Sequence, residues 1–200
     1  MIQHMADAGK KASQESPSVS RVRVNPGAEL IKSRPMRQEA SESSWQYIEL
    51  VPEGDICDIL KGQQDAVVDL LTNALGNKAF YRYAADKWTA AEVVGHLIDT
   101  ERVFAFRAFW LARGLSDALP GFDQLTVAEW ARRAPRDWPA LIDEFETLRT
   151  ATLQLVRPLE ESVWARSGTI NDMQTSVRAL VYGITGHTAH HVAQLRTLYL

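Results

Sequence analysis

The sequence lacks the features that mark secreted, membrane-spanning and nucleic-acid-binding proteins. It has a single cysteine, Cys57, so it forms no internal disulfide, which fits a reducing compartment. No apolar run approaches the roughly 20 residues of a membrane-spanning helix, and the N-terminus has no apolar signal core. Lys and Arg number 22 against 25 Asp and Glu, so no basic excess suits nucleic acid. We therefore expect a cytoplasmic protein with no membrane and no nucleic-acid partner.

The remaining composition is that of one globular domain preceded by a polar segment. Of the 200 residues, 46% are hydrophobic and 24% charged, which are ordinary values. Residues 1–44 are rich in Ser, Gln, Lys, Arg and Glu, and such a segment buries too little apolar surface to offset the entropy of ordering it. We predict a disordered leader over 1–44, with Met36 as an alternative natural start, and a single domain over 45–200.

Apolar residues recur at steps of three and four along four segments of this domain, the periodicity of amphipathic helices. The predicted helices cover residues 56–74, 89–113, 138–159 and 175–200. Thr89 and Glu92 form a capping box at the second start, and Gly114 follows its end. The connection 115–139 carries a short helix predicted to begin at Thr126, with a capping box to Glu129. No strand-like alternation competes, so the sequence predicts an all-α protein: a four-helix bundle with a long connection between the second and third helices.

A pair of histidines marks the last predicted helix. His187 and His191 are four residues apart, so their side chains project from one face about one turn apart. Both face the apolar side, where an imidazole needs a hydrogen bond or a metal ion, because an unpaired buried polar group costs about 1–3 kcal/mol. A single histidine there is more often a hydrogen-bonded core residue. The pair leaves both interpretations open, a shared metal ion and hydrogen-bonded packing.

His96, on the second predicted helix, also faces the bundle interior. Three inward imidazoles from two helices form an open facial site, in which water or substrate completes the coordination. We predict that His96, His187 and His191 bind a divalent metal ion. Three nitrogen ligands suit Zn, Ni or Fe, and affinity order alone does not choose among them.

His190 is the ambiguous histidine of the last helix. It shares a stripe with small residues that allow close backbone approach, either as a seam within the chain or as an interface: Ala179, Gly183 and Gly186. This placement favours a helix-packing position at the rim of the site. A metal pair of His187 and His190 is the alternative, but it leaves the inward His191 unused.

Two polar residues close to the histidines are candidates for supporting or substrate-binding roles. Asp99 lies one turn from His96 and is a candidate acceptor that orients its ring, as metal-bound histidines usually require. A solvent-facing carboxylate is the alternative. Gln194 lies one turn beyond the histidine pair, where it lines the site or packs against it.

Arg107 lies eleven residues beyond His96 on the same helical face, about three turns away at ~1.5 Å per residue. That separation is too large for direct metal ligation. It suits either an anion-binding arm or a buried ion pair with Glu101 or Glu144, and the ion pair is the favoured interpretation.

Several segments in matching order, from about residue 54 to residue 200, resemble the DinB-like superfamily of four-helix-bundle metalloproteins, and most closely its second, poorly assigned DinB subfamily. The resemblance rests on these residues: Lys87-Trp88-Thr89, Gly95-His96-Leu97-Ile98-Asp99-Thr100-Glu101, Arg107, Leu119-Pro120-Gly121-Phe122-Asp123 and His187-Thr188-Ala189-His190-His191-Val192-Ala193-Gln194-Leu195. In that family one histidine of the second helix and an H-x3-H pair of the last helix bind the metal. The resemblance places these roles on His96, His187 and His191.

The resemblance also implies a class of activity. The superfamily includes S-transferases that use bacillithiol or mycothiol, a thiol-dependent maleylpyruvate isomerase, and many members with no assigned reaction. We therefore expect a metal-dependent, thiol S-transferase-like enzyme that uses a low-molecular-weight thiol and a small electrophile, and forms a homodimer. No general base stands out in the sequence. A non-catalytic metal-dependent binding or stress-response protein and a metal-assisted hydrolase remain the alternatives.

Overall fold

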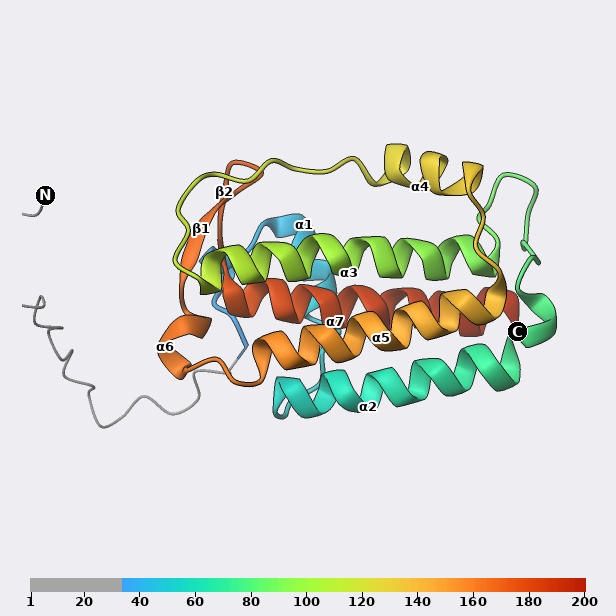
Figure 1. The fold of residues 1–200 in the computed structure, drawn as a ribbon, viewed down its shortest axis with the longest axis horizontal. Helices are drawn as coiled ribbons and strands as arrows, with labels where there is room; N and C mark the ends of the chain where they lie inside the picture. The colour runs from blue at the N-terminus through green and yellow to red at the C-terminus, as the bar shows by residue number, and fades with distance from the viewer. Residues whose placement is uncertain (1–33) are drawn as a thin grey trace, which may run out of the picture.

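The computed structural model describes residues 34–200, and four long helices within them pack side by side (Figure 1). They are α2 (Ile56–Asp69), α3 (Ala90–Ala112), α5 (Trp138–Val156) and α7 (Val177–Gln194). Helix α3 packs against α5 and α7, and α2 packs against the same two helices. The four-helix bundle predicted from the apolar periodicity is confirmed.

Shorter elements extend or cover the bundle. They are η1 (Arg37–Glu39), α1 (Glu42–Ile48), η2 (Leu70–Ala74), η3 (Gly76–Lys78), α4 (Gln124–Arg133), α6 (Glu161–Trp164), β1 (Ser167–Ile170), β2 (Met173–Ser176) and η4 (Leu195–Tyr199). The π-helical turns η2 and η4 continue α2 and α7, so the first and last helices reach close to their predicted ends. The predicted long connection joins α3 to α5 and carries α4.

The start of α3 follows the predicted capping box, but the start of α4 does not. The Thr89 hydroxyl accepts from the Glu92 backbone N–H at 3.1 Å, and the Glu92 carboxylate accepts from the Thr89 N–H at 2.6 Å. In α4 the hydroxyl of Thr126 donates to the Asp123 carboxylate at 2.7 Å instead of capping the helix. Asp123 is the N-cap, because its other oxygen accepts from the Leu125 N–H at 2.9 Å. The prediction of a start at Thr126 is therefore wrong by two residues.

A two-stranded hairpin precedes the last helix, where the sequence predicted none. Strands β1 and β2 pair antiparallel across Asn171 and Asp172, whose φ values are 50° and 61°. Two positive φ angles in a two-residue loop are typical of a type I′ turn. Strands of four residues are too short for a clear alternation to appear. Helix α7 therefore begins at Val177, after the N-cap Ser176, and not at residue 175.

Residues 34–44, which the sequence analysis placed in a disordered leader, pack on the bundle. Glu39 forms an ion pair with Arg178, whose Nε donates to the carboxylate at 2.6 Å, and Ala40 is buried. An ion pair between distant residues does not appear in the pattern of apolar residues from which the leader was predicted. The domain therefore begins before residue 45, while the rest of the predicted leader, residues 1–33, lies outside the described residues.

These contacts make a prediction about truncation. A chain that starts at Trp45 should unfold with a free energy lower by roughly 2 kcal/mol than a chain that starts at Arg34, because the truncation removes charge-assisted hydrogen bonds and leaves Arg178 without Glu39. Urea denaturation of the two chains measures the difference. Equal midpoints and slopes would show that residues 34–44 contribute nothing to stability.

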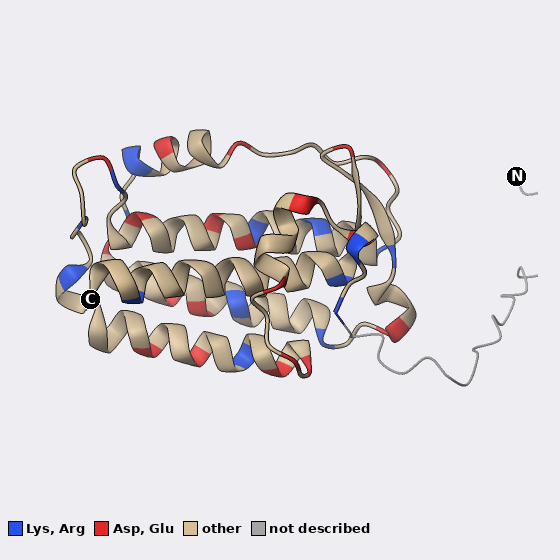
Figure 2. Cartoon of the chain, turned by 180° about the vertical axis from the view of Figure 1, so that it is seen from behind, with Lys and Arg blue, Asp and Glu red and all other residues tan. Residues whose placement is uncertain are grey.

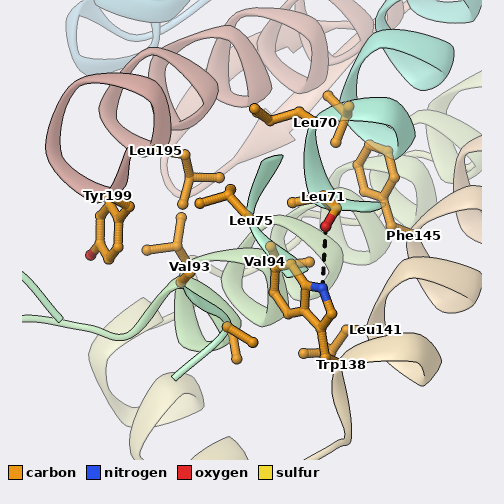
Figure 3. Close-up of a cluster of buried hydrophobic side chains, with 14 of the residues drawn as sticks. Leu70, Leu71, Leu75, Val93, Val94, Trp138, Leu141, Phe145, Leu195 and Tyr199 are labelled. Atoms are coloured by element: carbon orange, nitrogen blue, oxygen red, sulfur yellow. Dashed lines mark hydrogen bonds between the residues drawn. The ribbon is translucent and has the colours of Figure 1, made fainter. Parts of the chain in front are cut away.

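A hydrophobic cluster closes the end of the bundle at which α3 begins (Figure 3). Leu71, Leu75, Phe145 and Leu195 are completely buried there, contributed by α5 and the π-helical ends of α2 and α7. The indole N–H of Trp138 donates to the Leu71 carbonyl at 3.2 Å, which joins α5 to the end of α2. This cluster fixes the first turns of α3 relative to the end of α7.

A buried ion pair links all four bundle helices. The guanidinium of Arg149 in α5 donates to both carboxylate oxygens of Glu101 in α3, through Nε at 2.9 Å and Nη2 at 2.9 Å. Further donations reach Gln63 in α2 at 2.9 Å and the hydroxyl of Thr188 in α7 at 3.1 Å. Sequence reasoning missed this network, because its members are far apart along the chain.

The remaining charges are spread over the molecule. Acidic and basic residues both occur along each of α2, α3, α4 and α5 (Figure 2). Among residues 34–200, none of the helices combines the length and hydropathy that crossing a membrane requires.

Candidate metal centre

Three imidazoles converge between α3 and α7. His96 comes from α3, and His187 and His191 come from consecutive turns of α7. The Nε2 atom of His187 lies 3.0 Å from Nε2 of His96 and 3.1 Å from Nε2 of His191. One ring nitrogen from each residue lies within 4.8 Å of those of the other two. The structure therefore brings together the three histidines that the sequence singled out, as the spacing on α7 and the packing of α3 against it require.

Burial keeps these rings neutral. Burial lowers the pKa of His96 to about 4. Burial, and then the repulsion that a protonated His96 would exert, lowers the pKa of His191 to about 4. The pKa of His187 falls to about 2, because burial and then the adjacent imidazoles disfavour its charged form. A metal ion binds the neutral imidazole, so all three rings are in the ligating protonation state at pH 7.

Hydrogen bonds on the far side of two rings orient their lone pairs. The side-chain oxygen of Gln194 lies 2.9 Å from Nδ1 of His191, and since this oxygen only accepts, Nδ1 carries the proton. The Nε2 lone pair of His191 is then directed at the other imidazoles. The hydroxyl of Thr100 lies 3.4 Å from Nδ1 of His96 and is positioned for the same role. Gln194 thus borders the centre, as one of its two predicted placements required, and orients a ring.

Asp99 does not orient His96. Its carboxylate lies 3.5 Å from Arg102 and 3.7 Å from Arg136, on the side of α3 that faces α4 and α5. Burial raises the pKa of Asp99, although both arginines act in the opposite direction. Thr100 contacts the His96 ring instead, because a residue four positions further along a helix lies more nearly above it than one three positions further.

Aromatic rings enclose the centre on two sides. The Trp88 ring lies 5.0 Å from the His96 ring between centroids, and the Tyr47 ring lies 5.2 Å from His187 and 5.4 Å from His190. Tyr47 belongs to α1, which the sequence analysis did not predict. Its contact with His187 depends on how α1 packs against α7, so the sequence alone did not indicate it.

The small-residue stripe of α7 is a seam within the chain. A Cβ atom at Gly186 would overlap the carbonyl oxygen of Tyr47, so only glycine lets α1 approach α7 this closely. Ala179 is buried in the cluster that includes residues of α1. Of the two roles left open by the sequence, seam or subunit interface, the structure shows the seam. In the sequence, these small residues of α7 were the one sign that another segment, α1, packs against this face of the helix.

His190 lies at the rim and outside the converging group. Its Nε2 atom is 3.0 Å from the side-chain nitrogen of Gln194, and its ring lies 5.0 Å from that of His191. The structure thus places it against Tyr47 and Gln194, as the packing interpretation expected.

Arg107 does not form the predicted ion pair. Glu101 pairs with Arg149 instead, and Glu144 pairs with arginines 102 and 136. The Arg107 Nη2 atom donates to the Pro120 carbonyl at 2.7 Å. Three other arginines pair with these two carboxylates, and the predicted ion pair is wrong for that reason.

A cavity of about 220 Å³ reaches the centre from the end of the bundle, with His191 and Gln194 in its wall beside Trp88. Asp86 also borders this cavity, but its carboxylate pairs with Lys87 at 3.0 Å. In the part of the chain that the structure describes, no carboxylate hydrogen-bonds to any of the three converging imidazoles. The site can therefore offer three neutral nitrogen ligands and a path by which a small molecule can approach them. None of these ligands is hydrogen-bonded to a carboxylate of the described residues.

Comparison with known proteins agrees with this architecture. Residues 59–195, which include all three histidines, match the sequence model of the DinB superfamily. YfiT from Bacillus subtilis, described as a probable metal-dependent hydrolase with an unusual four-helix bundle topology, matches with a TM-score of 0.58 and 17% sequence identity. The match covers 83% of this chain and 91% of that protein, and at this identity it shows the fold alone. No curated protein matches the sequence.

Proposed function

The chain belongs to the DinB superfamily, and we propose that it is a metal-dependent enzyme that transfers a low-molecular-weight thiol to a small electrophile. His96, His187 and His191 would hold a divalent zinc, nickel or iron ion. The observation that carries the proposal is the convergence of three neutral Nε2 atoms from two helices. Three protein ligands leave a coordination position for substrate, as in catalytic rather than structural sites.

The residues around the triad have distinct tasks in this proposal. Gln194 holds His191 in the tautomer that presents Nε2, and the Thr100 hydroxyl is placed to accept a hydrogen bond from Nδ1 of His96 in the corresponding tautomer. Trp88 and Tyr47 pack against the rings and limit access of water from their sides. A bound divalent metal supplies the Lewis acidity that deprotonates a coordinated thiol.

Among the described residues, the carboxylates that share cavity walls with His96 or His191 are those of Asp86, Glu92 and Asp99, and each is paired with a basic side chain. This engagement of the nearby carboxylates favours a thiol over water as the nucleophile. Metal-dependent hydrolases commonly place a glutamate beside the metal as general base. A thiol deprotonated on coordination needs no such base. Its sulfur would form a bond to the electrophilic carbon as the leaving group departs with the bonding pair, and the thiol proton would pass to solvent.

Metal-assisted hydrolysis is the second candidate function. The observation that favours it is the shared fold with YfiT, which is described as a probable metal-dependent hydrolase. A non-catalytic metal-dependent binding or stress-response protein is the third. We also propose a homodimer, from the family resemblance, with an interface elsewhere than the Gly186 seam, which α1 already covers.

The thiol proposal makes a spectroscopic prediction. Adding glutathione, cysteine, bacillithiol or mycothiol to the cobalt-substituted protein should produce intense sulfur-to-metal charge-transfer bands for at least one of them. The same thiol should react with 1-chloro-2,4-dinitrobenzene faster when the protein is present, and the gain should vanish in His96→Ala but persist in His190→Ala. Four thiols that neither change the spectrum nor react would eliminate the transferase. Metal-dependent hydrolysis of 4-nitrophenyl acetate would then support the hydrolase.

A further inference from the structure

Arg107 is a buried cation that lacks an acidic partner among residues 34–200. Its residue surface is only 8% exposed, and the Pro120 carbonyl at 2.7 Å is its one hydrogen-bond acceptor in that part of the chain. A guanidinium has five N–H donors, and burying its charge is unfavourable without a paired anion. The buried Arg149, by contrast, is paired with Glu101 and donates to three further acceptors. Arg107 therefore has donors available for an anion.

A cavity of about 430 Å³ lies beside this arginine. Its volume falls within the range of roughly 300–1,000 Å³ that small-molecule sites occupy. It lies between α1, the connection that precedes α4 and the β1–β2 hairpin. Figure 1 shows α1 and the hairpin in the half of the bundle where α3 ends. The phenyl rings of Phe104 and Phe122 flank the guanidinium, with centroids 5.7 and 5.6 Å from its central carbon. Ile170 and Leu180 extend the apolar wall.

The polar part of the wall does not neutralise Arg107. Ser43, Ser44 and Thr175 contribute hydroxyl groups. The one carboxylate in the wall, that of Asp123, accepts from the Leu125 N–H at 2.9 Å and from a threonine hydroxyl at 2.7 Å. Asp123 is engaged in capping α4 and forms no ion pair with Arg107.

This cavity is separate from the imidazole centre. Arg107 follows His96 by eleven residues on α3, a distance of about 16 Å along the helix axis at ~1.5 Å per residue. A small molecule held at Arg107 does not reach the three imidazoles, so the cavity forms a second site.

We propose that this cavity binds a small organic monocarboxylate with an apolar body. The carboxylate accepts from the Arg107 guanidinium, whose planar fork matches two carboxylate oxygens, and the apolar body lies against Phe104 and Phe122. A single cation, with the Asp123 carboxylate also in the wall, favours one negative charge over the two of a phosphate.

Phenylacetate and its neutral counterpart phenylacetamide test the proposal on the full chain. Phenylacetate should shift the backbone amide NMR signals of residues 104–107, 119 and 121–123. Phenylacetamide should bind at least about tenfold more weakly, as expected when a charged hydrogen bond is lost. Arg107→Gln should weaken phenylacetate binding by a similar factor. Arg102→Gln, which removes an exposed arginine of the same helix, should leave the affinity unchanged.

Three results would overturn the carboxylate site: equal binding of the two compounds, shifts confined to other residues, or tighter binding of inorganic phosphate. If Arg107→Gln does not fold because it loses the Pro120 contact, the comparison of the two compounds on the unaltered chain and the Phe122→Ala variant decide. Loss of the apolar wall in Phe122→Ala should weaken phenylacetate binding while Arg107 remains. Chelator-treated protein should bind phenylacetate equally well, so failure here is distinct from failure of the metal proposal.

Discussion

Replacing His187 with alanine should abolish stoichiometric binding of a divalent metal. Its Nε2 atom lies 3.0 Å from that of His96 and 3.1 Å from that of His191. Its removal therefore leaves only two of the three nitrogen ligands. His191→Ala should have the same effect. Loss of a partner that only orients a ligand costs about 10–100-fold in metal affinity, so Gln194→Ala should weaken binding by about that factor and ligand removal by more. Elemental analysis of protein purified without a nickel column, followed by calorimetric titration with zinc, measures these effects.

His190→Ala is the matched control on the same helix. Its ring lies at the rim and outside the group of converging nitrogens, so most of the metal should remain bound. Retention of metal by His191→Ala together with its loss from His190→Ala would reverse the ligand assignment. Retention of metal by all four variants would place the ion elsewhere and remove the basis of the proposed function.

Local spacing accounts for what the sequence could predict. The step from His187 to His191 fixes a common direction on any helix, and the apolar stripes on α3 and α7 decide that both faces point into the bundle. The Thr89–Glu92 capping box likewise specifies its own geometry within four residues. Predictions of this kind depend only on the geometry of a single helix, and the apolar residues of these helices recur with a clear helical period.

Contacts between distant segments account for most of what the sequence did not predict. Glu101 pairs with Arg149 rather than Arg107, although Arg107 is far closer in sequence, because α5 delivers its guanidinium to the bundle interior. Tyr47 reaches the imidazoles only because Gly186 lets α1 settle on α7. Polar anchoring of residues 34–44 and strands of four residues lack the hydrophobic periodicity on which sequence reasoning depends.

Replacing Arg149 with methionine should lower the free energy of unfolding by about 3–5 kcal/mol, because it leaves the Glu101 carboxylate buried without its cation. The two side chains are only 0% and 2% exposed, so water cannot replace the lost hydrogen bonds without opening the bundle. Urea denaturation at pH 7 measures the loss. Arg102→Met is the matched surface variant: Arg102 pairs with Glu144 at 2.5 Å but is 46% exposed, and its loss should cost less than about 1 kcal/mol.

The double variant Glu101→Leu/Arg149→Met separates loss of the ion pair from damage to packing. Removing both charges also removes the unpaired carboxylate, so the double variant should recover most of the stability that Arg149→Met loses. A double variant as unstable as the single one would mean that the shape of Arg149, or its hydrogen bonds to Gln63 and Thr188, carries the stability instead. Thr188 directly follows His187 on α7, so metal affinity of the double variant gives a second readout. An unchanged affinity would show that the ion pair stabilises the bundle without positioning the imidazoles.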